Sequence, residues 1–166
     1  MMNQRLNGRV AIVTGAGAGL GRAHALELAR HGARVVVNDM GHGAAQSVAD
    51  EIRRQGGEAI AVTGDVTRSD QVDAMAAQTL DRWGRIDILV NNAGILRDRT
   101  FAKMSLDEFR LVMDGHVMGA VHCTKAVWAH MLEQQYGRIV MTTSSSGLYG
   151  NFGQSNYGAA KMALVG

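Results

Sequence analysis

The residue types best suited to chemistry lie near the end of the sequence. Tyr157 and Lys161 are four residues apart, so one helical turn places both side chains on the same face. A lysine ammonium beside a phenol favours the phenolate, which can exchange a proton with a substrate oxygen near neutral pH. Ser144 follows an apolar run and could hydrogen-bond to the same oxygen. These three residues predict a proton-transfer site.

The elements that would position this site are short apolar runs alternating with helical patterns. We expect buried strands near residues 9–14, 35–37, 59–62, 86–90 and 138–143. Helical stripes cover residues 20–31, 45–52, 72–83 and 105–131, and a last helix carries Tyr157 and Lys161. This alternation with short loops predicts an α/β fold with a doubly wound parallel sheet of about five strands. Residues 1–166 are interpreted as one domain.

Composition narrows the possible partners. The hydrophobic fraction is 46%, the charged fraction is 19%, and the net charge is only +2, with no cluster of Lys and Arg. We therefore expect no nucleic-acid partner, and the lack of a long apolar run predicts no membrane span. The first eight residues have no signal-peptide core, so we expect a cytoplasmic protein. Cys123 is the single cysteine, and neither it nor the histidines have metal-ligand spacing.

A glycine-rich loop follows the first predicted strand. Gly15, Gly19 and Gly21 lie between that strand and the next helix. Glycines at this place let the backbone approach a pyrophosphate at a helix N-terminus. The spacing differs from the commonest dinucleotide fingerprint, and tight turns also need glycine. In the strand–loop–helix context we interpret the loop as a cofactor site.

Polar residues follow the other strands. Asp39, after the second strand, can accept hydrogen bonds from the ribose hydroxyls of NAD, and its charge would repel the extra phosphate of NADP. The alternative is a solvated loop carboxylate. Asp65-Val66 and the segment 91–94 lie at later strand ends, where they could line an adenine and ribose cleft or form turns. NAD is therefore the predicted cofactor.

These motifs, in this order and spacing, resemble those of the main subgroup of short-chain dehydrogenases/reductases. The resemblance covers the whole chain and implies a Rossmann-like dinucleotide-binding domain. It implies that Tyr157 is the general acid/base, that Ser144 orients the substrate oxygen, and that Lys161 assists Tyr157 and holds the nicotinamide ribose. The implied cofactor-binding residues are Gly15, Gly19, Leu20, Gly21, Asp39, Asp65, Val66, Asn91, Ala93, Gly94, Tyr157 and Lys161.

His116 departs from the family pattern. Members usually have an asparagine here, three residues before a glycine, which supports a water chain to the lysine. Imidazole also donates and accepts hydrogen bonds, so His116 is a candidate for the catalytic group. A histidine satisfied within the core is the equal alternative.

Segments 92–99 and 149–154 are more narrowly similar to (3R)-hydroxyacyl-CoA dehydrogenase domains of peroxisomal multifunctional enzymes, and bacterial 3-oxoacyl reductases share part of this similarity. The implied substrate is an acyl thioester or another secondary alcohol, and the implied assembly is a homo-oligomer. Family members are longer, so we expect a domain incomplete at its C-terminus, without the last two strands and with 139–141 as a sheet edge. The alternative function is a cofactor-binding fragment or oligomer-forming homologue without turnover.

Overall fold

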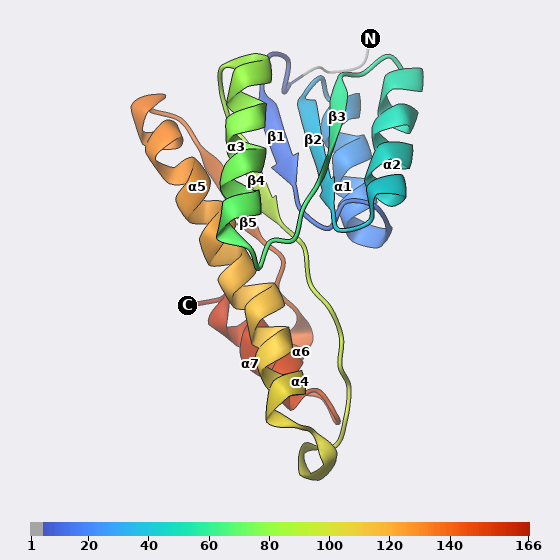
Figure 1. Ribbon diagram of the computed structural model, residues 1–166, viewed down its shortest axis with the longest axis vertical. Coiled ribbons are helices and arrows are strands. Elements are labelled where there is room, and N and C mark those ends of the chain that lie inside the picture. The colour runs from blue at the N-terminus through green and yellow to red at the C-terminus, as the bar shows by residue number, and fades with distance from the viewer. Residues whose placement is uncertain (1–4) are drawn as a thin grey trace.

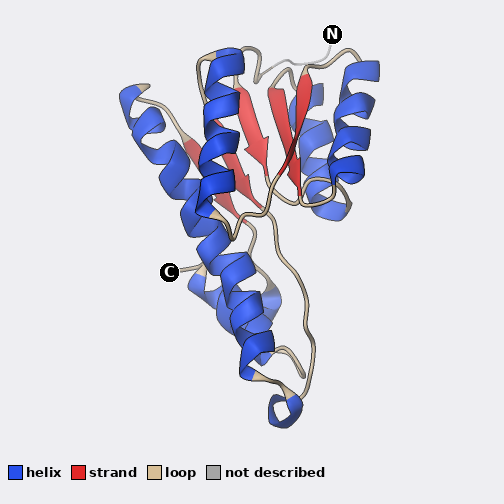
Figure 2. Ribbon diagram, in the orientation of Figure 1, coloured by secondary structure: helices blue, strands red, loops and turns tan. Residues whose placement is uncertain are grey.

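A five-stranded parallel sheet forms the centre of the computed structural model, which describes residues 5–166 (Figures 1 and 2). The strand order is β3-β2-β1-β4-β5, so the chain reverses direction across the sheet at β1. The strands are β1 Val10–Val13, β2 Arg34–Asp39, β3 Ala59–Thr63, β4 Ile88–Asn91 and β5 Arg138–Met141. The predicted α/β class and the five parallel strands are confirmed.

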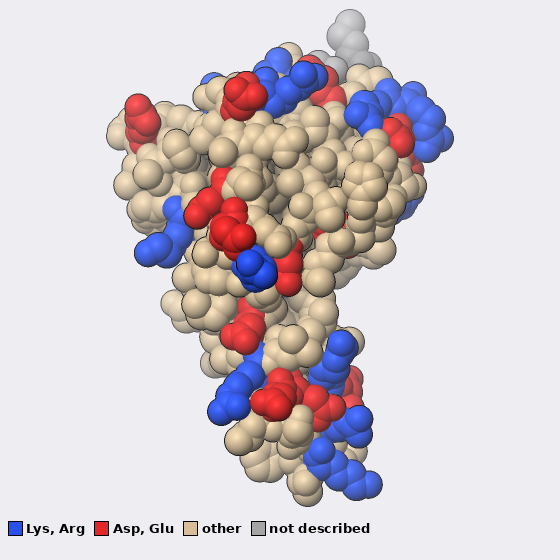
Figure 3. All heavy atoms as spheres, in the orientation of Figure 1, with Lys and Arg blue, Asp and Glu red and all other residues tan. Residues whose placement is uncertain are grey.

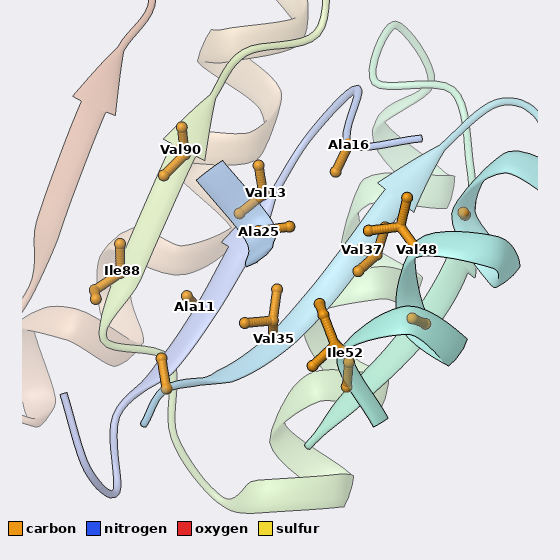
Figure 4. Close-up of a cluster of buried hydrophobic side chains, with 14 residues drawn as sticks. Ala11, Val13, Ala16, Ala25, Val35, Val37, Val48, Ile52, Ile88 and Val90 are labelled. Carbon is orange, nitrogen blue, oxygen red and sulfur yellow. The ribbon is translucent and has the colours of Figure 1, made fainter. Parts of the chain in front are cut away.

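Helices cover both faces of the sheet. On one face, α1 and α2 pack against Val35, Val37 and their neighbours, the cluster shown in Figure 4. On the other face, α3 and α5 pack against Ile12, Val36 and Leu89. Successive strand residues point to opposite faces, which explains why strands buried on both sides read as continuous apolar runs. The helix bounds are α1 Gly19–Arg30, α2 His42–Arg54, α3 Ser69–Trp83 and α5 Gly119–Glu133.

The long helix predicted over 105–131 is interrupted. It consists of α4, Leu106–Met113, a π-helical segment, Asp114–Met118, and α5. The expected capping box at its start is present, because Ser105 Oγ accepts from the Glu108 backbone N–H at 3.1 Å and Glu108 accepts in return. A π-helical turn adds a residue to the ladder and turns His116 into the interior, where it is 4% exposed.

A narrow lobe extends beyond the carboxyl ends of the strands (Figure 1). It contains α4, α6 (Ser145–Tyr149) and α7 (Ser155–Ala163), with α7 packed against both other helices. A short 3₁₀ turn, Phe101–Lys103, precedes α4. The edge strand β5 alternates exposed and half-buried residues, as expected. Within residues 5–166, no helix is long and apolar enough to cross a membrane.

Candidate active site

The glycine-rich loop is held against the loop that follows β4. Gly15 has a φ of +59°, and a Cβ there would lie 2.8 Å from Ala93 Cα. A Cβ on Gly21, within the first turn of α1, would lie 2.2 Å from the Gly15 carbonyl oxygen. Both positions therefore exclude any side chain. Leu20 is 66% exposed beside Gly19, so the start of α1 faces open space.

Thr14 and Asn92 fix this arrangement, although neither is among the predicted site residues. The Asn92 amide donates to the carbonyl oxygens of Thr14 and Gly15 at 3.0 and 3.1 Å. Thr14 Oγ1 accepts from the backbone N–H groups of Asn92 and Ala93. Asn92 lies inside the polar segment recognised after β4, but the sequence does not show which of its two asparagines reaches the glycine loop.

Asp39 ends β2 and faces the same loop. Its Oδ2 accepts from the Gly17 N–H at 2.9 Å and its Oδ1 from the Gly41 N–H at 3.0 Å. The carboxylate is half-buried. It is therefore oriented by the glycine loop, while part of it stays open to a ligand.

A cleft of about 380 Å³ lies at the carboxyl ends of the strands. Its lining includes six of the twelve predicted cofactor residues, namely Gly15, Asp39, Asp65, Val66, Ala93 and Gly94. Asp65 Oδ1 accepts from the backbone and hydroxyl of Thr67, which fixes the carboxylate at the rim. A second hollow of about 410 Å³ lies around Gly32 and Gly57, at the opposite end of the sheet. Doubly wound sheets bind ligands at the carboxyl ends, which favours the cleft at Asp39.

Asn91 points away from this lining. It is 5% exposed, and its amide donates to Thr124 Oγ1 of α5 and to the Met141 sulfur of β5. Its Oδ1 has no hydrogen-bond partner among the described residues. Asn91 therefore connects β4 to its two neighbours and keeps one buried acceptor unused.

Tyr157 and Lys161 lie close together on α7, and His116 lies beside Tyr157. Lys161 Nζ lies 5.6 Å from the centroid of the Tyr157 ring and donates to the Thr142 carbonyl at 2.5 Å. His116 meets the Tyr157 ring edge-on, with centroids 5.3 Å apart. His116 also fills the space beside Gly94, where a Cβ would lie 1.9 Å from His116 Cε1. His116 therefore touches both the cleft wall and Tyr157.

Burial sets the charge state of two of these groups. It lowers the pKa of Lys161 to about 8, because the ammonium is 3% exposed and loses its hydration. Burial also lowers the pKa of His116; its bond to Ile95 opposes this shift, and the nearby charge of Lys161 adds to it. His116 is therefore neutral at pH 7, and its Nδ1 is buried without a partner in the described chain.

Ser144 caps the short helix α6. Its Oγ accepts from the Ser146 N–H at 3.2 Å, and a hydroxyl in this role keeps its own proton free to donate. Helix α6 lies close against α7, since a Cβ on Gly147 would sit 3.0 Å from the Lys161 carbonyl carbon. Thr143 Oγ1 adds a bond to the Lys161 carbonyl at 2.7 Å. The end of β5 and the start of α6 are thereby fixed to the helix that carries Tyr157.

The histidines and the cysteine show no clustering in residues 5–166, where no group of three His, Cys, Asp or Glu could hold a metal ion. Cys123 lies on the buried face of α5 and packs into the core, and burial raises the pKa of its thiol to about 12.

Comparison with known proteins identifies relatives of this arrangement. The sequence model for "short chain dehydrogenase" matches residues 9–166. Peroxisomal multifunctional enzyme type 2 of Drosophila melanogaster is 53% identical over 98% of this chain, and the match spans 28% of that enzyme. The 3-oxoacyl-[acyl-carrier-protein] reductase of Synechocystis is 49% identical over 97% of this chain and 66% of its own.

A solved structure agrees with the fold. It is a 7α-hydroxysteroid dehydrogenase complexed with NADH and 7-oxo glycochenodeoxycholic acid, 37% identical, with a TM-score of 0.93. The similarity covers 98% of this chain and 63% of that one. The family match, the sequence identity and the shared fold lead to one conclusion: the chain belongs to the short-chain dehydrogenase family.

Proposed function

We propose that the protein is an NAD-dependent oxidoreductase that interconverts a secondary alcohol and a ketone by hydride transfer. The observation that carries the proposal is the junction at His116, where the cleft at the strand ends meets the pair Tyr157 and Lys161. The proposed dinucleotide site and the proposed proton-transfer residues are therefore adjacent, which supports hydride transfer coupled to proton transfer.

The residues around the cleft suit a nicotinamide dinucleotide. Gly15 and the exposed start of α1 at Gly19-Leu20 would receive the pyrophosphate, with Gly21 allowing the close packing behind it. Asp39 would accept hydrogen bonds from the adenosine ribose, and its negative charge favours NAD over NADP. Asp65 and Val66 would line the adenine pocket, with Ala93 and Gly94 forming the opposite wall. When bound, the nicotinamide supplies or accepts the hydride.

The residues in and beside the lobe formed by α4, α6 and α7 would carry out the proton transfer. During oxidation of the alcohol, Tyr157 removes the hydroxyl proton as the carbon loses its hydride, and it returns that proton during ketone reduction. Lys161 would stabilise the ionised Tyr157 and bind the nicotinamide ribose, and Ser144 would hold the substrate oxygen. Neutral His116, with Nδ1 unused, would continue a proton path towards Lys161.

The substrate we propose is a 3-hydroxyacyl thioester. Its support is the similarity to the Drosophila multifunctional enzyme and to the Synechocystis reductase, whose name specifies a 3-oxoacyl group on acyl-carrier protein. The proposal includes a single dinucleotide-binding domain over residues 1–166, incomplete at its C-terminus, and a homo-oligomeric assembly. A cytoplasmic location is also proposed, although several similar proteins are named peroxisomal.

One assay tests the proposal. The 166-residue chain is mixed with NAD and (3R)-3-hydroxyacyl-CoA, and NADH formation is followed beside a direct measurement of NAD binding. Turnover that Tyr157→Phe abolishes without weakening NAD binding supports the dehydrogenase. NAD binding without turnover favours the cofactor-binding alternative, and absence of NAD binding refutes both. Repeating the assay in reverse with 3-oxoacyl groups on CoA and on acyl-carrier protein distinguishes the two substrate classes.

A further inference from the structure

An extended segment links the cleft to the lobe that carries Tyr157. It comprises residues 95–99, which follow β4 without regular secondary structure and run along the lower lobe in Figure 1; we name it the strap. At the end of the strap that is nearer to β4, Ile95 and Arg97 line the cleft. At its lower end, the Arg99 N–H donates to the Gly153 carbonyl at 2.8 Å, just before α7.

Side chains from elsewhere in the chain bind the strap at successive residues. His116 Nε2 lies 3.1 Å from the Ile95 nitrogen and 2.8 Å from the Ile95 oxygen. Gln154 donates to Asp98 at 2.9 Å. The charged strap residues themselves are exposed, and Figure 3 shows that this lobe carries charges of both signs. The strap is therefore held by hydrogen bonds and not by a core of its own.

Asn156 links the strap directly to the backbone of Tyr157. It is fully buried, and its Nδ2 donates to the Arg97 carbonyl at 3.0 Å. Its Oδ1 accepts from the N–H of Tyr157 at 2.7 Å. The buried Asn156 amide therefore makes two hydrogen bonds. One is to the strap at Arg97 and the other is to the backbone of Tyr157. A buried amide with both bonds made fixes the relative position of its two partners.

We propose that Asn156 is a positioning residue: through the strap, it sets the place of Tyr157 relative to a ligand in the cleft. The proposal rests on the proposed function for the roles of the cleft and of Tyr157. Nothing in it requires Asn156 to touch substrate or cofactor. A misplacement of about 1 Å in a reacting group can reduce a rate about a hundredfold, so a small shift of α7 is sufficient to matter.

The test uses Asn156→Asp, which keeps the shape of the side chain but replaces its Nδ2 donor with an oxygen. A carboxylate cannot donate to the Arg97 carbonyl, whereas the protonated acid can restore both bonds. Burial raises the pKa of such a carboxyl, so the variant should be ionised at about pH 9 and protonated at about pH 6. Asn7→Asp, at an exposed position, is the matched control. The charged and ionisable groups on the neighbouring elements, including Arg97, Asp98, His116, Tyr157 and Lys161, are the same in both variants, so the ratio of the two kcat values isolates position 156.

We expect Asn156→Asp to lower kcat by between about tenfold and a hundredfold at high pH, with NAD affinity unchanged and kcat recovering at low pH. Asn156→Ala, which cannot regain the bond, should stay impaired at both values. The proposal is wrong if the ratio of Asn156→Asp to the control is the same at both pH values. It is also wrong if Asn156→Ala matches the wild type.

A second readout does not depend on turnover. Tyr157 is one of three tyrosines, so tyrosine-labelled NMR can follow its ring, with Tyr157→Phe as the assignment variant. NAD should shift this signal in the wild type, and in Asn156→Asp only at low pH. An equal response in Asn156→Asp and the wild type at both pH values overturns the strap proposal. If the wild type fails to bind NAD, the proposed function is refuted. The strap proposal is then tested by the spectra recorded without NAD. Relative to the Asn7→Asp control, the NMR signal of the Tyr157 ring should change with pH only in Asn156→Asp.

Discussion

Gly94 and His116 form a matched pair, and substituting Gly94 measures how tightly they fit. In Gly94→Ala the new methyl group would lie 1.9 Å from His116 Cε1 and 2.3 Å from Nδ1. The ring is 4% exposed and bound to Ile95, so it cannot turn out to solvent without leaving that bond. Overpacking costs about 1–3 kcal/mol and a lost hydrogen bond about 1 kcal/mol. We expect a total loss of about 2–4 kcal/mol in unfolding free energy.

Urea unfolding of a double-mutant cycle gives the measurement. Gly43→Ala is the control, because a Cβ there has nothing within 4 Å and its position in α2 tolerates alanine. Removing the ring in His116→Ala creates space for the methyl group, so the double variant should be more stable than additivity predicts, by about 1–3 kcal/mol. The reasoning is refuted if Gly94→Ala is no more destabilising than Gly43→Ala, or if the two changes at 94 and 116 add to within about 0.5 kcal/mol.

Three further substitutions test the site. Lys161→Met should raise the unfolding free energy by about 1–3 kcal/mol at pH 7, because the folded-state pKa of about 8 lies below the usual 10.5. The burial penalty is complete below pH 8 and falls as pH rises towards 10.5, so a gain that persists at higher pH would contradict this origin. Asp39→Ala should lower the ratio of NAD to NADP affinity about tenfold, and an unchanged ratio would remove Asp39 from cofactor selection. Asn92→Ala should destabilise by about 1–3 kcal/mol in urea unfolding, whereas Asn7→Ala should have no effect.

The sheet was predictable because its central strands are buried on both faces. Val10–Val13 and Val35–Val37 are continuous apolar runs, and such runs between helical stripes leave few alternatives. The glycine loop was predictable for a related reason: only glycine tolerates the approach between Gly15 and Ala93. The π-helical segment was not, because one additional residue in a long apolar stripe leaves the helical period nearly intact.

The hydrogen bonds that connect distant elements could not be predicted from the sequence either. Gln154 and Asn156 look like ordinary polar residues at the start of a helix, yet their partners Asp98 and Arg97 lie more than fifty residues earlier. Hydrogen bonds between distant loops have no local pattern. His116 shows the same limit, since the sequence left a relay and a core role equally open. In the structure it is bonded to the Ile95 backbone, its ring contacts that of Tyr157, and its Nδ1 has no partner among the described residues.

The two ends of the sheet differ in how completely their buried polar groups are paired. At the amino ends of the strands, burial alone would raise the pKa of Asp87, but bonds from Arg85, the Val10 N–H and Arg9 hold it below its usual value. Every oxygen of that carboxylate is bound, which is typical of a structural ion pair.

At the carboxyl ends the pairing is incomplete. Asn91 Oδ1 and His116 Nδ1 are two of the three buried side-chain atoms without partners in residues 5–166; the third, Trp83 Nε1, lies where α3 ends, before the amino end of β4. Lys161 is buried there too: its ammonium donates to the Thr142 carbonyl, and burial lowers its pKa to about 8. Unpaired polar groups are destabilising in a folded chain, so two of them at the carboxyl ends of the strands favour a functional role there over a structural one. The incomplete pairing therefore supports the proposed site at the same end of the sheet as the cleft, on grounds separate from the sequence motifs.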